Sequence, residues 1–214
     1  MDWIYKLERK FSRYAIPGIV NYIVAGQVLV FLAMFFINAS FGDYTALWRA
    51  YVLQGQVWRL VTFVFYPLNT SPLWFAISAY FYYFVGKMLE FTWGSFRLNL
   101  YIYITVLGAI AAAMLTGYAS NSYLLLSLYL AYAMLYPERE VLLFFVLPVK
   151  VKWMGWISGG FCLLAFLLGG LGTKVNILCS MAGFLVFFGK DFWNAARAKV
   201  RRERWRHRNR KNWR

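Results

Sequence analysis

The side chains in this sequence that could do chemistry are few and scattered. The one histidine, His207, lies in the segment RRERWRHRNRKNWR, with no cysteine or second histidine near it. Zinc sites need three or four ligands of the His, Cys or carboxylate type, and the eight acidic residues are spread along the chain. The sequence therefore predicts no metal site and no cofactor. It also offers no histidine base for a catalytic serine.

A serine–lysine dyad is the catalytic pair that remains conceivable. Lys87 and Lys190 are the lysines nearest to the apolar segments. Both come where an apolar segment ends, so we expect their ammonium groups to reach the membrane interface rather than a buried serine.

Any functional site would have to be positioned by long apolar segments, because these make up most of the chain. The chain is 62% hydrophobic and only 14% charged, whereas soluble domains carry about 25% charged residues. The apolar residues form blocks of about 20, which is long enough to cross a hydrocarbon core about 30 Å thick. We therefore expect an all-α integral membrane protein with a single bundle. Cys162 and Cys179 both fall inside apolar blocks, which favours small buried residues over a disulfide.

Six blocks predict six transmembrane helices. In residues 1–14 bulky and charged residues alternate at helical spacing, which predicts an amphipathic helix lying on the membrane surface. The expected organisation is this helix, a six-helix membrane domain over 15–195 and a basic tail over 196–214. The expected spans are about 19–40, 72–91, 96–117, 122–136, 153–171 and 175–193.

The distribution of cations predicts the orientation. With six spans, only Arg49, Arg59 and Lys174 of the 23 Lys and Arg residues would fall on the side opposite the termini. Because cytoplasmic loops are enriched in Lys and Arg, both termini should be cytoplasmic.

The loop 41–71 contains the first candidate site. Its stretch around Trp58 and Arg59 is too interrupted to span a bilayer and too hydrophobic for water, so half-insertion at the interface is expected. An arginine there is costly unless its guanidinium reaches a lipid phosphate, a carbonyl or a carboxylate. Simple interface anchoring and a specific role in shaping the loop both remain open.

Three further features have structural or binding interpretations. Glu90 can accept hydrogen bonds from the first amides of the next helix. Cys179 and Gly183 form a small-xxx-small pattern that favours close helix packing, within the bundle rather than between subunits. The tail favours anionic lipid, with RNA contact as the alternative, through Arg201, Arg202, Arg204, Arg206, Arg208 and Arg210.

Three segments together resemble the rhomboid superfamily. GQVWRLVT (55–62) is similar to the first-loop signature with its Trp-Arg pair. GKMLEFTWGSFR (86–97) is similar to the G-x-x-x-E-x-x-x-G pattern that ends the second helix, with Gly86, Glu90 and Gly94 at its fixed positions. LAYAMLYP (130–137) is similar to the fourth helix. The resemblance covers about 40–195 and implies a six-helix rhomboid-like bundle with a half-inserted first loop.

The resemblance also implies that catalysis has been lost. Active rhomboids carry G-x-S-G, but this chain has Ser120-Asn121-Ser122-Tyr123, without the glycines that frame an oxyanion site. The catalytic histidine would fall at Phe184, or at Ser180 in a shifted alignment. The second-helix histidine and asparagine would fall near Trp74 and Ser78.

The pattern that remains is similar to derlins, which are inactive rhomboids. It implies a pseudoprotease that binds transmembrane client proteins for quality control, trafficking or degradation. Membrane lipids and a membrane protease or AAA-type ATPase would be its other partners. A prokaryotic cell membrane is favoured, or the endoplasmic reticulum in a eukaryote. The alternatives are a small multi-pass subunit or transporter component, and a residual protease that uses Ser122 with an unconventional base.

Overall fold

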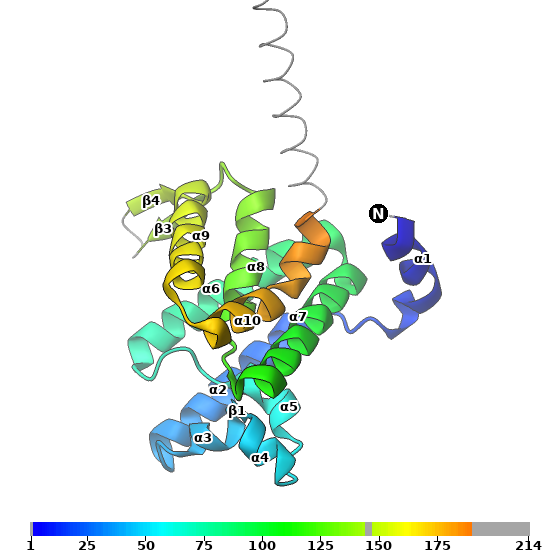
Figure 1. The fold of residues 1–214 in the computed structure, drawn as a ribbon. Helices are drawn as coiled ribbons and strands as arrows, with labels where there is room; N and C mark the ends of the chain where they lie inside the picture. Colours follow the sequence, from blue (N-terminus) through cyan, green and yellow to red (C-terminus); the bar gives the residue numbers. More distant parts are fainter. Residues whose placement is uncertain (1, 144–146, 190–214) are drawn as a thin grey trace, which may run out of the picture.

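The computed structural model describes residues 2–143 and 147–189, and this part of the chain is mostly helical (Figure 1). Five helices of 14 to 22 residues form most of the bundle, and the pair α10 Leu171–Ser180 and Ala182–Gly189 completes it. The five are α2 Ile19–Phe36, α6 Pro72–Trp93, α7 Ser95–Thr116, α8 Ser122–Leu135 and α9 Val151–Leu168.

Three of these helices, α2, α7 and α9, are long and apolar enough to cross a membrane. A fourth span results if α10 Leu171–Ser180 and the helix Ala182–Gly189 together make one crossing. The described part of the chain is therefore that of a mostly helical, membrane-associated protein.

Helix α7 occupies the interior of the bundle and α9 its periphery. Of the most apolar stretch of each helix, 44% is buried in α7 but only 6% in α9. Proline and glycine set the ends of the helices near α7. Pro72 begins α6, Gly94 reverses the chain between α6 and α7 with a φ of 80°, and Gly117 ends α7 with a φ of 96°. A positive φ of this size favours glycine because it has no Cβ.

The segment predicted as one sixth helix is broken. Helices α10 and Ala182–Gly189 meet at a bend of 56°. Neither glycine nor proline stands at the break, at Met181. Tertiary packing explains the bend better than local sequence, because the backbone carbonyl of Cys179 lies directly over Gly108 of α7.

The predicted loop 41–71 forms a folded lobe, which we define as residues 41–66. It contains the helices α3 Phe41–Thr45, α4 Arg49–Leu53 and α5 Arg59–Thr62, the 3-10 turn η2 Phe63–Phe65, and the short strand β1 Leu47–Trp48. Strand β1 pairs with β2 Tyr118–Ala119, just after α7. The lobe therefore lies at the end of the bundle where α7 ends (Figure 1).

Helix α1 Asp2–Phe11 and the 3-10 turn η1 Ser12–Tyr14 coincide with the predicted surface helix. Arg97 at the start of α7 binds Glu8 of α1 at 2.9 Å and lies over the ring of Tyr5. A hairpin of β3 Glu140–Leu143 and β4 Leu147–Lys150 connects α8 to α9.

Candidate functional site

Arg59 is the centre of the lobe, and it is buried, with 3% of its surface exposed. Its Nη1 donates to the carbonyl oxygens of Asp43 and, at 2.8 Å, of Ala46, while its Nε donates to Gln56 Oε1 at 2.8 Å. The guanidinium also lies 4.5 Å from the centre of the Tyr51 ring. The sequence predicted that the guanidinium would reach a lipid phosphate, a carbonyl or a carboxylate, and in the structure it binds backbone carbonyls. These bonds tie α3 and Ala46, the residue that follows it, to the start of α5.

The surface of the lobe is apolar, although its interior is held by polar bonds. Trp58, adjacent to Arg59, is 51% exposed, and Val57 and Val61 are more exposed still. Aromatic side chains with a polar edge are enriched where lipid headgroups meet hydrocarbon. A water-soluble loop would turn these side chains inward, so this surface is typical of a membrane-associated protein. Other exposed large side chains of the lobe are Phe41, Tyr44, Trp48, Tyr51 and Leu53.

Two buried amides fasten the lobe to the bundle. Gln27 of α2 donates through Nε2 to the carbonyl oxygen of Val64 at 3.2 Å. Asn121, just before α8, donates through Nδ2 to the same carbonyl at 3.1 Å and to that of Tyr66 at 2.8 Å. Sequence reasoning missed both roles. A glutamine within an apolar block was a signal, because polar side chains in such blocks usually find a partner.

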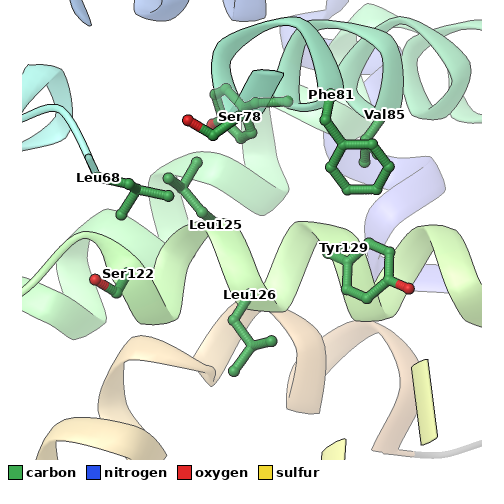
Figure 2. A pocket seen from close by; sticks show the side chains of 9 residues that line it. Leu68, Ser78, Phe81, Val85, Ser122, Leu125, Leu126 and Tyr129 are labelled. Carbon is green, nitrogen blue, oxygen red and sulfur yellow. The ribbon is translucent and has the colours of Figure 1, made fainter. Parts of the chain in front are cut away.

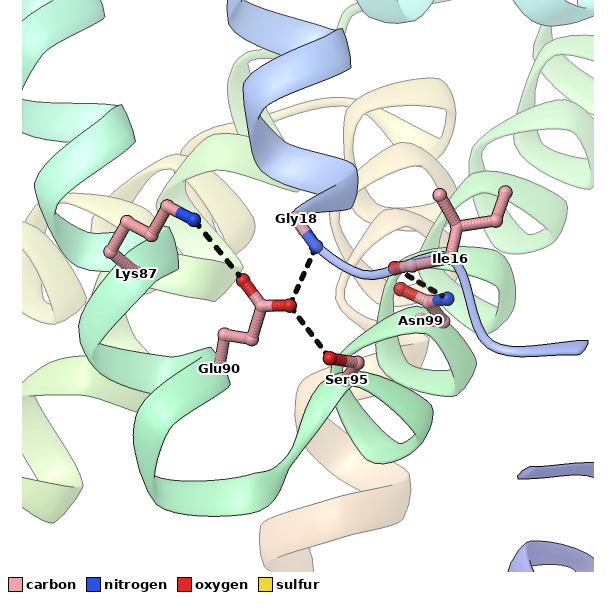
Figure 3. A network of polar contacts seen from close by, with 6 residues as sticks. All are labelled: Ile16, Gly18, Lys87, Glu90, Ser95 and Asn99. Carbon is pink, nitrogen blue, oxygen red and sulfur yellow. Dashed lines mark hydrogen bonds and ion pairs between the residues drawn. The ribbon is translucent and has the colours of Figure 1, made fainter. Parts of the chain in front are cut away.

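Glu90 joins three segments at the other end of the bundle (Figure 3). Its Oε1 accepts from the backbone amide of Gly18 at 2.6 Å and from Ser95 Oγ at 2.7 Å, and its Oε2 lies 3.7 Å from Lys87 Nζ. Glu90 was expected to accept hydrogen bonds from the first amides of the helix that follows it, and its amide partner is a different one. The bond comes from Gly18, before α2, whereas α7 contributes the hydroxyl of Ser95.

The glycines of the same motif differ in what they do. A Cβ on Gly86 would lie 2.5 Å from the side chain of Val20, so Gly86 lets α2 approach α6. Gly94 instead supplies the positive φ of the turn between α6 and α7. All three motif positions are therefore accounted for by the packing of α2, α6 and α7.

Ser122 lies at the start of α8, and its hydroxyl pairs with that of Ser120 at 2.8 Å. Ser122 and Ser78 both line a cavity of about 260 Å³ between α6 and α8 (Figure 2), which we call the α6–α8 cavity. Ser78 Oγ donates to the carbonyl of Phe75 at 2.9 Å and accepts from Asn69 Nδ2 at 3.3 Å. These serines thus have hydroxyl and amide partners, and the rest of the cavity wall is mostly hydrocarbon.

The other positions named by the sequence have varied surroundings. Ser180 and Phe184 are buried, near the break after α10, whereas Trp74 is half exposed on α6. In residues 2–143 and 147–189, no three His, Cys, Asp or Glu side chains gather closely enough to hold a metal ion.

Cys179 and Gly183 lie against α7. A Cβ on Gly108 would lie 1.8 Å from the Cys179 carbonyl oxygen, and a Cβ on Gly183 would lie 2.1 Å from Thr105 Oγ1. These close approaches are possible because Gly108 and Gly183 have no side chain, and Cys179 takes part through its backbone carbonyl. The small residues are thus used at a contact within the chain.

Several sequence predictions fall outside the described residues. They concern Lys190, His207 and the basic tail with Arg201, Arg202, Arg204, Arg206, Arg208 and Arg210.

Comparison with known proteins yields no relative. No protein-family model, no curated protein and no solved structure matches the chain.

Proposed function

We propose that the chain is a non-catalytic membrane protein of rhomboid-like, derlin-like type, which binds transmembrane segments of client proteins. The client would then be passed to quality control, trafficking or degradation by a further membrane protease or AAA-type ATPase. The observation that carries this proposal is the lobe. A buried Arg59, bonded to two backbone carbonyls and to Gln56, holds together a small lobe whose surface is apolar and aromatic.

The proposed bundle has six crossings. Alongside α2, α7, α9 and the bent pair α10 with Ala182–Gly189, it assigns α6 and α8 to the membrane. Helix α8 has only 14 residues, which rise about 21 Å at 1.5 Å per residue. A bilayer about 30 Å thick would have to thin beside it, and thinned lipid next to the lobe would favour the approach of a poorly fitting client helix.

The chemistry around Ser122 supports the non-catalytic part of the proposal. The hydroxyl of Ser122 pairs with that of another serine, Ser120, which is no base at neutral pH. The family positions for the catalytic histidine hold Ser180 or Phe184. A small multi-pass subunit or transporter component is the competing function, and the diversity of captured clients distinguishes the two.

The test compares Arg59 with Arg49, an exposed arginine in the same lobe. A photo-crosslinker at Val61 would capture a defined single-span reporter segment in native membranes. We expect Arg59→Ala to lower capture severalfold, because the carbonyls of Asp43 and Ala46 lose a charged donor. Arg59→Lys should recover only part of it, since a point charge does not reproduce the planar fork.

Arg49→Ala is the control and should leave capture unchanged, because it removes the same charge from the same lobe without touching those carbonyls. All variants are compared at matched expression and matched melting temperature. Equal capture by Arg59→Ala and wild type would contradict the proposal and leave Trp58 and Arg59 as simple anchors at the interface.

A further inference from the structure

The α6–α8 cavity is a long, narrow space. Along α6 it extends from Ser78 to Val85, and along α8 from Ser122 to Tyr129. Figure 2 shows Ser78 and Ser122 toward the end near Leu68, with Val85 and Tyr129 toward the other. Ser78 and Val85 are seven residues apart, as are Ser122 and Tyr129, and seven residues span roughly 10 Å along a helix.

The shape of the cavity limits what can fill it. A volume of about 260 Å³ is far smaller than that of a helix segment roughly 10 Å long and about 10 Å across. A stretch of a single hydrocarbon chain fits such a volume.

The chemistry of the wall agrees with a hydrocarbon occupant. Beyond the two serines, the wall is made by the apolar side chains of Phe81, Val85, Leu125 and Leu126, together with the rings of Tyr82 and Tyr129. Ser78 and Ser122 make their hydrogen bonds within the chain, to Phe75, Asn69 and Ser120. An occupant therefore needs no polar group along most of its length.

We propose that the α6–α8 cavity binds one acyl chain of a membrane lipid, with the ester end of the lipid near Ser78 and Ser122. The bound chain fills a space that would otherwise leave the facing walls of α6 and α8 without contacts. The proposal requires only that α6 and α8 lie in the membrane. It does not depend on client binding.

The experiment uses the full chain in vesicles that contain a phosphatidylcholine with a diazirine on its acyl chain. After irradiation, mass spectrometry locates and quantifies the adducts. A bound chain should label Phe81, Val85, Leu125 or Leu126, and this labelling should saturate at a low mole fraction of probe. Labelling of exposed Leu107 on α7, which contacts bulk lipid, should rise linearly with the mole fraction instead.

Two variants fill the cavity from opposite walls, Ser78→Phe from α6 and Leu126→Trp from α8. Displacing even two methylenes of the chain weakens binding roughly tenfold, so cavity adducts should fall by that factor. Leu107→Trp is the matched control and should leave them unchanged. Melting temperatures identify any variant that fails to fold, and the saturation curve of the wild type tests the proposal without a variant.

Three results would overturn the proposal. Cavity adducts could rise linearly with the probe, as expected of bulk lipid. They could persist in both filled variants. Alternatively, the cavity could be labelled by a diazirine-bearing single-span peptide and not by the lipid, which would assign it to a client side chain.

Discussion

At the scale of single residues, Gly108 sets the distance between two elements by having no side chain. A Cβ there would lie 1.8 Å from the Cys179 carbonyl oxygen, whereas a Cβ on exposed Gly160 of α9 would meet nothing within 4 Å. We expect Gly108→Ala to destabilise the fold by about 1–3 kcal/mol, because α7 and α10 would have to separate. Gly160→Ala should be neutral or slightly stabilising. Thermal unfolding of the two variants in the same detergent makes the comparison, and equal melting temperatures would contradict the packing assigned to Gly108.

Ser122 provides a second prediction at this scale. Ser122→Ala should leave client capture unchanged and should abolish no cleavage, because the hydroxyl of Ser122 pairs with the hydroxyl of Ser120 and not with a base. Wild type should likewise resist labelling by a serine-reactive fluorophosphonate. Loss of cleavage of a transmembrane substrate in Ser122→Ala, or labelling that depends on Ser122, would instead identify a residual protease.

The residues also show what sequence alone could and could not predict. That Arg59 needs a compensating partner followed from its apolar neighbours, but its bonds to the carbonyls of Asp43 and Ala46 depend on how the lobe folds. The role of Glu90 at a helix start was foreseen, but its amide partner is Gly18, which is 72 positions away in the chain. Contacts of this kind are set by tertiary packing, and no local pattern encodes them.

At the scale of elements, apolar block length predicted helix positions well. The blocks expected at about 72–91, 96–117 and 122–136 correspond to α6 Pro72–Trp93, α7 Ser95–Thr116 and α8 Ser122–Leu135. The break after Ser180 and the pairing of β1 with β2 were missed. Hydrophobicity reports how much of a segment avoids water, but it does not report where a neighbouring helix forces a bend.

The basic tail is the element whose predicted role can be tested separately. Each Lys or Arg close to an anionic membrane surface contributes on the order of 1 kcal/mol. Removing residues 197–214 should therefore weaken binding of protein in neutral nanodiscs to anionic vesicles while leaving the melting temperature unchanged. Replacing Arg201, Arg202, Arg204, Arg206, Arg208 and Arg210 by Gln in the full-length chain should have most of the same effect. Flotation with anionic and neutral vesicles measures this.

Equal binding of the full-length and truncated chains to both kinds of vesicle would contradict the lipid-binding prediction. A truncation that instead lost ribosomes from purified membranes would favour the RNA alternative, because phosphate contact and base stacking use the same arginines and tryptophans.

At the scale of the whole molecule, two contacts indicate which segments share a side. The bond of Arg97 to Glu8 places α1 beside the turn between α6 and α7. The pairing of Leu47 with Ala119 places the lobe beside the turn between α7 and α8. These neighbours agree with helices that cross alternately from α2 to α8. The proposed crossings of α6 and α8 and that of the bent pair all need a test, and the bent pair is the least regular, because its two helices meet at 56°.

Topology reporters decide whether that last pair crosses the membrane. If it does, a reporter that is active only outside the cytoplasm should be active when fused after Gly170 and inactive when fused after Arg214. The cation distribution favours this result, since the segment from Lys190 onward is rich in arginine and cytoplasmic segments are enriched in Lys and Arg. A cytoplasmic fluorescent reporter should give the opposite pattern at the same two positions. Activity of the first reporter after Arg214 would mean that α10 and Ala182–Gly189 enter and leave on one side, as a re-entrant segment, and the six-span arrangement would be wrong.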